Sequence, residues 1–266
     1  MKVNNICMKK ILLLSFLLII STLNSYSATF EGGVSAEGVG QSSRIVDKNT
    51  GLGVGGAKVT LPKQQYSTKT DENGFFELKT EIDGTTIMSI QKDNYKPFSV
   101  TINEQTLSAP IVIGIEKSNV GGLVLDSNMY HLGDNNFSDL SANAGEFRME
   151  SIGPFYTKRF TLKNLKFDKP IFLVIGSIIG IDTNMARSIG QNHITNAFAS
   201  APEIYFNGNK ISEVQINGDS QKIRIPSALV KKNQINEVTI KTGRNLMQSA
   251  YIDYDDIEFM NLFIEN

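Results

Sequence analysis

Residues 44–61 read Arg-Ile-Val-Asp-Lys-Asn-Thr-Gly-Leu-Gly-Val-Gly-Gly-Ala-Lys-Val-Thr-Leu, and residues 67–78 read Ser-Thr-Lys-Thr-Asp-Glu-Asn-Gly-Phe-Phe-Glu-Leu. Apolar residues alternate with polar ones, as in Ala57, Val59 and Leu61, which turns one face of a strand inward. Turn residues recur every eight to twelve positions, and Asn, Asp and Gly suit backbone reversal. This spacing predicts an antiparallel β-sandwich.

Strand patterns continue along the chain, and strong helical patterns are missing. We predict strands over residues 86–91, 98–102, 160–167, 171–175, 203–206, 214–216, 223–225, 237–241 and 257–264. Residues 171–175 are continuously apolar, which is typical of a strand covered on both faces. Residues 182–200 lack alternation and predict a long loop with a helical turn around residues 184–188. Asn207-Gly208 predicts a hairpin turn. The fold class is therefore all-β.

The first 27 residues predict a signal peptide. Lys9 and Lys10 precede a ten-residue apolar segment, Ile11–Ile20, and the small residues Ser25 and Ser27 fit cleavage after residue 27. A membrane anchor is the alternative, but a spanning helix needs about twenty apolar residues. We therefore expect a secreted or periplasmic protein with no membrane span after cleavage.

The composition of the exported chain excludes several classes of chemistry and of partner. Without residues 1–27 it carries 23 basic and 27 acidic residues and has no cysteine, since Cys7 is the only one. Disulfides and thiolate chemistry are thereby excluded. No cluster of Lys and Arg is present, so nucleic acid is not an expected partner. Tryptophan is absent, and Tyr, Phe or His must supply any ring that stacks on a ligand.

The first half of the exported chain resembles the carboxypeptidase regulatory-like domain, a transthyretin-like β-sandwich. The resemblance rests on Ile45-Val46-Asp47, Asn49-Thr50-Gly51, Gly56-Ala57-Lys58-Val59, Thr70-Asp71-Glu72-Asn73-Gly74-Phe75-Phe76 and Tyr95-Lys96-Pro97. It covers about residues 42–115. It implies an extracytoplasmic setting and carries no active site.

The second half resembles the galactose-binding-like jelly rolls of secreted carbohydrate-binding proteins. Residues 204–211, 225–230 with 236–240, and 254–259 carry this resemblance. We therefore expect an N-terminal Ig- or transthyretin-like β-sandwich and a C-terminal jelly-roll β-sandwich. The expected divisions are a signal peptide (1–27), a flexible arm (28–43), the first sandwich (44–116), a linker (117–122) and the jelly roll (123–266).

A polar cluster in the second half is the candidate ligand site. Amide and carboxylate groups near flat rings can hydrogen-bond sugar hydroxyls and stack on a sugar face. The candidate residues are Tyr130, His131, Asp134, Asn135, Asn136 and Asn143, with Asn192, His193 and Arg244 from other loops. We expect Tyr130, His131 and Asn136 at an exposed loop rim. The alternative interpretation is a polar turn loop whose side chains cap their own backbone.

An acidic string precedes and enters the last predicted strand. Asp253, Asp255, Asp256 and Glu258 offer hard oxygen ligands, which suit a structural Ca²⁺ ion. Sugar-binding jelly rolls that this region resembles often hold such an ion. The alternatives are a solvated strand face and a carboxylate pair for glycoside cleavage.

Catalysis is not expected. His131, Asp134 and His193 are the residue types that bind zinc, but the chain has no HExxH motif and no Gly-x-Ser-x-Gly motif. The first functional hypothesis is a non-catalytic protein that binds carbohydrate through its jelly roll. The second is a protein-protein interaction or adhesion module of the cell envelope with no sugar ligand. A polysaccharide-acting enzyme is the third.

Overall fold

The computed structural model describes residues 34–36, 42–118, 122–143, 145–163 and 169–266, with residues 34–36 described as backbone alone. The predicted signal peptide lies outside the described residues, as do much of the 28–43 arm and residues 119–121 of the predicted linker. The described chain is nearly all β and has one short α-helix, α1 (Asn184–Ser188), and one 3₁₀ turn, η1 (Ser227–Leu229). The all-β prediction is confirmed. No helix among the described residues combines the length and apolar character needed to cross a membrane.

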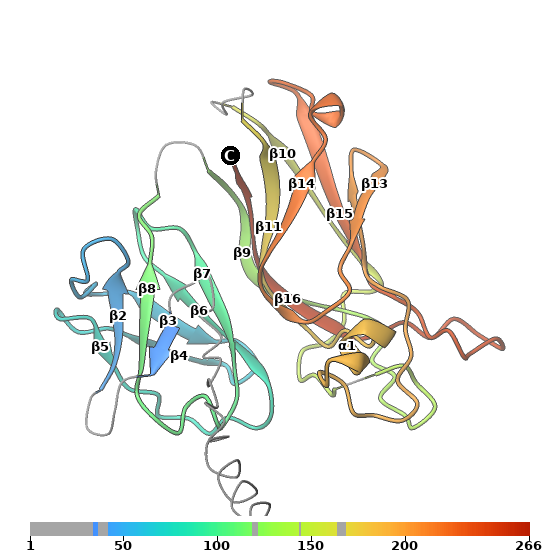
Figure 1. Cartoon of the computed structure of the whole chain (residues 1–266), viewed down its shortest axis with the longest axis horizontal. Coiled ribbons are helices and arrows are strands. Elements are labelled where there is room, and N and C mark those ends of the chain that lie inside the picture. Colours follow the sequence, from blue (N-terminus) through green and yellow to red (C-terminus); the bar gives the residue numbers. More distant parts are fainter. Residues whose placement is uncertain (1–33, 37–41, 119–121, 144, 164–168) are drawn as a thin grey trace, which may run out of the picture.

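The first described part, residues 34–115, forms two four-stranded sheets that we call the N-terminal sheet pair (Figure 1). One sheet has the order β1 (Val34–Ala36), β8 (Ile111–Ile115), β2 (Ser43–Asp47), β5 (Phe75–Phe76). The other has the order β4 (Tyr66–Lys69), β3 (Lys58–Leu61), β6 (Thr86–Gln91), β7 (Phe98–Ile102). Neighbouring strands are antiparallel except β2 and β8, which run parallel. Both sheets contribute to one apolar core that includes Ile45, Val59 and Ile113.

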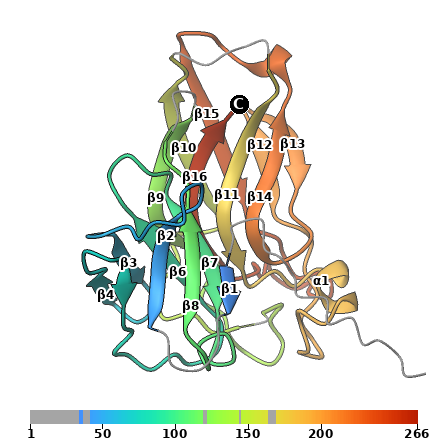
Figure 2. The same ribbon diagram turned by 60° about the vertical axis from the view of Figure 1, so that its left-hand side comes forward.

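The second part, residues 123–265, forms two more four-stranded sheets, the C-terminal sheet pair (Figure 2). One sheet has the order β14 (Gly218–Ile225), β11 (Ile171–Ile179), β16 (Ile257–Glu265), β9 (Leu123–Leu132). The other has the order β10 (Phe155–Thr161), β15 (Ile235–Lys241), β12 (Glu203–Phe206), β13 (Asn209–Glu213). All their pairings are antiparallel. Leu173, Phe206 and Phe259 belong to a core shared by these sheets.

Turn chemistry in the sequence accounts for the hairpins. Asn207 (φ 49°) and Gly208 (φ 80°) both have positive φ between β12 and β13, as the Asn-Gly pair predicts. The Asp71 carboxylate accepts hydrogen bonds from the backbone N–H groups of Asn73 and Phe75, while Gly74 takes φ 85°. A Cβ at Gly74 would lie 2.3 Å from the carbonyl oxygen of Ile45, so this turn requires glycine.

Two predicted strands differ from the observed ones. Residues 214–216 form no strand, because β13 pairs with β12 only as far as Glu203 opposite Glu213, where β12 begins. Val214 instead donates its backbone N–H to the carbonyl of Pro202. The strand predicted over residues 160–167 is β10, Phe155–Thr161, so it starts earlier. Residues 164–168 lie outside the described residues.

The N-terminal sheet pair packs against the sheet that contains β11 (Figures 1 and 2). Ile87 of β6 joins Met129, Ile179 and Met260 in an apolar cluster between the sheet pairs. Every residue of β11 except Phe172 is buried, which confirms the prediction of a strand covered on both faces.

Polar contacts hold the same face together beside the apolar cluster. The Ser177 hydroxyl donates to the Ser99 hydroxyl over 2.9 Å. The Asp219 carboxylate accepts from both the backbone N–H and the hydroxyl of Thr101. A Cβ at Gly176 would lie 2.6 Å from the Ser99 hydroxyl oxygen, so glycine permits this close approach of β7 and β11.

Candidate functional site

Tyr130 and His131 lie on opposite faces of β9, because successive side chains of a strand alternate. Tyr130 faces the C-terminal core, where its ring centroid lies 4.5 Å from that of Tyr156 and 5.7 Å from that of Phe259. Its hydroxyl donates to the Asp126 carboxylate over 2.9 Å. The expected exposed rim containing Tyr130 and His131 is therefore wrong. Both residues belong to β9, a strand that the sequence analysis did not predict.

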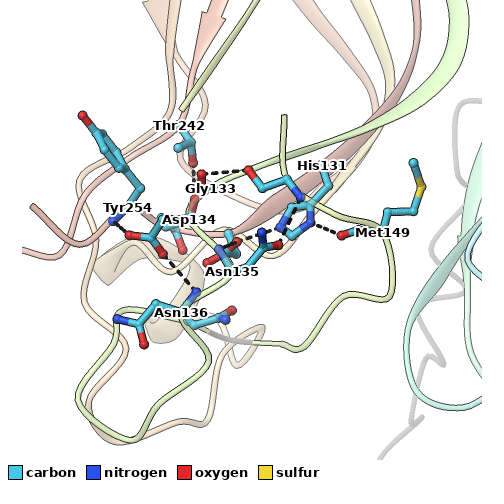
Figure 3. Close-up of polar contacts among 12 residues, drawn as sticks. His131, Gly133, Asp134, Asn135, Asn136, Met149, Thr242 and Tyr254 are labelled. Atoms are coloured by element: carbon cyan, nitrogen blue, oxygen red, sulfur yellow. Dashed lines mark hydrogen bonds and ion pairs between the residues drawn. The ribbon is translucent and has the colours of Figure 1, made fainter. Parts of the chain in front are cut away.

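His131 is fully buried and both of its ring nitrogens have acceptors (Figure 3). Nε2 lies 2.7 Å from the Asp256 carboxylate, and Nδ1 lies 2.5 Å from the Met149 carbonyl oxygen. Burial alone lowers the pKa of His131, but the Asp256 and Met149 contacts outweigh it and hold the pKa above its ordinary value. Neither nitrogen is free to take a proton from a substrate, so this pair fits a structural ion pair.

The loop after β9 uses its polar side chains to fix its own backbone. Asp134 accepts from the backbone N–H of Asn136 and, over 2.9 Å, from that of Tyr254 (Figure 3). Asn136 accepts from the backbone N–H of Ser138, and Asn143 accepts from that of Gly145. The alternative interpretation of this segment, a polar turn loop that caps its own backbone, is confirmed at these positions. Burial raises the pKa of Asp134, and nearby carboxylates add to the effect.

Asp253 ties this loop to the segment before β16. One carboxylate oxygen accepts from the Asn136 amide (2.9 Å) and the Ser141 hydroxyl (2.8 Å). The other accepts from the Ala142 backbone N–H (2.9 Å) and the Asn245 amide (2.8 Å). Four donors from two loops therefore converge on one buried carboxylate.

Asp255 lies in a separate buried environment beside Asp182. Asn192 is buried there as well, and its amide donates to the Asp182 carboxylate over 3.0 Å. Burial, together with the nearby Asp182 carboxylate, raises the pKa of Asp255 well above its ordinary value. Asn192 is consequently part of the loop scaffold and does not reach an exposed rim.

Glu258 occupies a third environment, on the face of β16 that looks toward the N-terminal sheet pair. It is paired in register with His131 and Ile179 and is fully buried. Neither carboxylate oxygen has a hydrogen-bond partner among the described residues. Burial raises the pKa of Glu258 to about 7, although His131 and Lys63 act in the opposite direction.

The four acids proposed as calcium ligands thus have different surroundings. Asp253 is saturated by its four donors, whereas His131 contacts only one of the two Asp256 carboxylate oxygens. Asp255, Asp256 and Glu258 keep carboxylate oxygens without a hydrogen-bond partner in the described chain. Across the described residues no three His, Cys, Asp or Glu side chains are grouped to hold one metal ion. Calcium binding stays a prediction. The solvated-face alternative is wrong, because all four acids are buried.

Four of the nine nominated residues face solvent. Asp134, Asn135, His193 and Arg244 are exposed, whereas Asn143 and Asn192 are buried. Arg244 forms an isolated bridge with Tyr254, which places it beside the Asp134 loop. Ligand binding by these exposed residues stays a prediction.

A group of exposed apolar side chains lies at the same end of the C-terminal sheet pair, and sequence reasoning missed it. Three adjoining loops contribute it: the Asn196 amide donates to the Asp139 carbonyl, the Asn245 amide to the Leu140 carbonyl, and the Leu246 N–H to the Phe198 carbonyl. Its exposed members are Leu140, Ile194, Leu246, Met247, Tyr251 and Ile252, which we call the apolar loop end.

The loop between β15 and β16 projects outward past α1 and carries four members of the apolar loop end (Figure 1). Met247 at 76% and Leu140 at 71% are among the most exposed large apolar side chains of the described chain. Apolar residues without strand alternation between Asn245 and Asp253 were the signal that could have revealed it.

A scan against protein-family models and a search of curated proteins both found no match to this chain. Its function is therefore argued from the geometry of the site.

Tyr130 provides a direct test of the corrected site. We expect Tyr130→Ala to lower the free energy of unfolding by about 3 kcal/mol, because it removes a core ring. Tyr130→Phe should cost about 1 kcal/mol, since it removes only the hydrogen bond to Asp126. Urea unfolding of both variants measures this. Unchanged stability of Tyr130→Ala would contradict the core position.

Proposed function

We propose that this protein is an exported, non-catalytic β protein that binds a protein partner at the cell envelope through the apolar loop end. Solvent-exposed apolar patches on soluble proteins commonly mark interaction sites. The observation that carries the proposal is the exposure of six large apolar side chains on three loops that hydrogen bonds hold together. Such side chains lose water when a partner covers them, which favours association.

Two further observations favour a protein over a sugar as the ligand. Tyr130, His131, Asn143 and Asn192, which the carbohydrate hypothesis requires at the surface, are buried or packed on the core. The exposed surface carries Leu, Ile and Met, whose aliphatic groups suit an apolar patch on a protein and offer sugar hydroxyls no hydrogen bond. Carbohydrate binding is the second candidate, with exposed Tyr251 as its available ring.

The chemistry of the buried groups supports a non-catalytic role. The pKa values of His131, Asp255 and Glu258 lie above their ordinary values, but none of these three side chains is exposed. A catalytic group must lie within hydrogen-bond reach of its substrate. These residues instead occupy the inside of the loop scaffold and the contact between the sheet pairs.

The proposed organisation is two β-sandwich domains, the first transthyretin-like and the second a jelly roll. Separate apolar cores in the N-terminal and C-terminal sheet pairs support this division. On this proposal the N-terminal domain packs on the outer face of the jelly roll, and the jelly roll presents the apolar loop end away from it. A signal peptide at residues 1–27 delivers the protein to the envelope.

The test replaces two exposed residues of the apolar loop end. We expect Leu246→Ser with Met247→Ser to weaken binding of the mature protein to envelope preparations at least about tenfold, because buried apolar anchors dominate interface energies. Melting temperature should stay unchanged, since both side chains face solvent. The matched control is Leu52→Ser, a leucine in the N-terminal sheet pair that is 70% exposed, which should bind normally.

Treating the envelope preparation with protease or with periodate distinguishes a protein ligand from a carbohydrate ligand. Protease digestion should abolish binding, and periodate, which destroys sugars, should leave it intact. Binding that survives protease and is lost after periodate would replace this proposal with the carbohydrate hypothesis. Full binding by the double variant would exclude the apolar loop end as the contact surface.

A further inference from the structure

The described methionines differ widely in exposure, and Met149 is half-buried. Met247 is 76% exposed and Met185 is 52% exposed, whereas Met88, Met129 and Met260 are buried. A thioether reacts with hydroperoxides according to how easily the oxidant reaches its sulfur. The structure therefore assigns very different reactivities to side chains of one chemical type.

The backbone of the apolar loop end holds Met247 outward. The Met247 N–H donates to the Asn245 side-chain oxygen over 2.8 Å. The Asn245 amide in turn donates to Asp253 and to the Leu140 carbonyl, so the buried Asp253 carboxylate anchors the base of this loop. The sulfur is thus presented by a fixed turn at the surface proposed above to contact the partner.

We propose that Met247 is a reversible oxidation site at which hydroperoxides switch off partner binding. This inference rests on the proposed function. In the reaction the thioether sulfur attacks the peroxide and forms a new S–O bond while the O–O bond breaks. Hydrogen peroxide is reduced to water, and the methionine is oxidised by two electrons to its sulfoxide. Methionine sulfoxide reductases, with a thiol as electron donor, carry out the reverse step.

The expected consequence follows from the change in polarity. The sulfoxide is polar and chiral, so it opposes burial where the apolar thioether favours it. Met247 follows Leu246 in the apolar loop end, and on the proposed function this surface binds its partner by removing apolar side chains from water. Oxidation at Met185, on α1 and outside the apolar loop end, should not have this effect.

The experiment combines peptide mapping with binding. The mature protein is treated with graded hydrogen peroxide, and sulfoxide at each methionine is measured by mass spectrometry. We expect Met247 to oxidise at least about tenfold faster than Met260, whose side chain is buried. Envelope binding should fall about tenfold in parallel and recover after treatment with methionine sulfoxide reductases and dithiothreitol.

Two conservative variants assign the effect to one sulfur. Met247→Leu should bind before and after peroxide, because leucine keeps the apolar volume and cannot be oxidised. Met185→Leu, the matched control, should lose binding after peroxide like the unmodified protein. Equal oxidation rates at Met247 and Met260 would overturn the modification site. Loss of binding by oxidised Met247→Leu would overturn the switch. Selective oxidation in a protein that binds no envelope protein would overturn the proposed function and the switch, while supporting Met247 as the reactive site.

Discussion

Replacing Glu258 by Gln is expected to stabilise the protein by about 3 kcal/mol at pH 8 and to have little effect at pH 4. Burial raises the pKa of Glu258 to about 7 from an ordinary value of 4.5, and no described residue donates a hydrogen bond to its carboxylate. The folded state therefore retains a proton that the unfolded state releases. The resulting penalty is absent below pH 4.5, grows as the pH rises toward 7 and is constant above it. Glutamine cannot ionise and avoids the penalty.

The control for this variant lies on the same strand. Glu265 accepts hydrogen bonds from Lys96 and also pairs with Lys222. Burial alone would raise the pKa of Glu265, but these lysines hold it below its ordinary value. Glu265→Gln should therefore destabilise the protein slightly at neutral pH, by less than about 1 kcal/mol. Urea unfolding at several pH values measures the free energy of unfolding of each variant and of the wild-type protein as a function of pH. A Glu258→Gln curve parallel to the wild-type curve would contradict the buried, unpaired carboxylate.

Removing the Asp253 carboxylate is expected to destabilise the protein by about 3–5 kcal/mol, the range for breaking a buried network by loss of one partner. Asp253→Ala leaves donors of Asn136, Ser141, Ala142 and Asn245 without their acceptor. The two loops that these donors belong to should separate. Partner binding should then fall with stability, because Asn245 positions the base of the loop that carries Met247.

Asp139→Ala is the matched control, since this exposed aspartate lies in the same loop and its carboxylate is not part of the Asp253 network. It should unfold like the wild-type protein. Hydrogen exchange at Ala142, whose N–H donates to Asp253, gives a local measurement. Unchanged protection of that amide in Asp253→Ala would show that the loop is held by other contacts.

The local sequence was sufficient to predict the position of most of the strands. The ranges 86–91, 98–102 and 203–206 match β6, β7 and β12, and residues 184–188 match α1. These elements have clear alternation or clear turn residues at their ends, and both signals act within a few positions of the chain. The turns at Asp71–Gly74 and Asn207-Gly208 were predictable for the same reason.

The candidate site was less predictable because its partners are distant in sequence. In any strand, successive side chains point to opposite faces, which would place Tyr130 and His131 on different sides. Only the pairing of β9 with β16 shows that the strand continues to Leu132. His131 finds its carboxylate at Asp256, 125 positions away. No local sequence pattern predicts such a pair, because no acidic partner of His131 lies near it in the sequence.

The sequence by itself determined an all-β fold, its main turns and the alternation of each strand, because these depend on backbone preferences and on the polarity of near neighbours. Only the tertiary structure decided which faces are covered. The acidic string of residues 253–258 looks solvated as a sequence, yet it is buried because the loop after β9 and the N-terminal sheet pair close over it. The residues of the apolar loop end are of the types that usually form a core, yet they are exposed because no described element packs on them. Burial depends on contacts between distant segments, and a single strand carries no information about which of them will cover it.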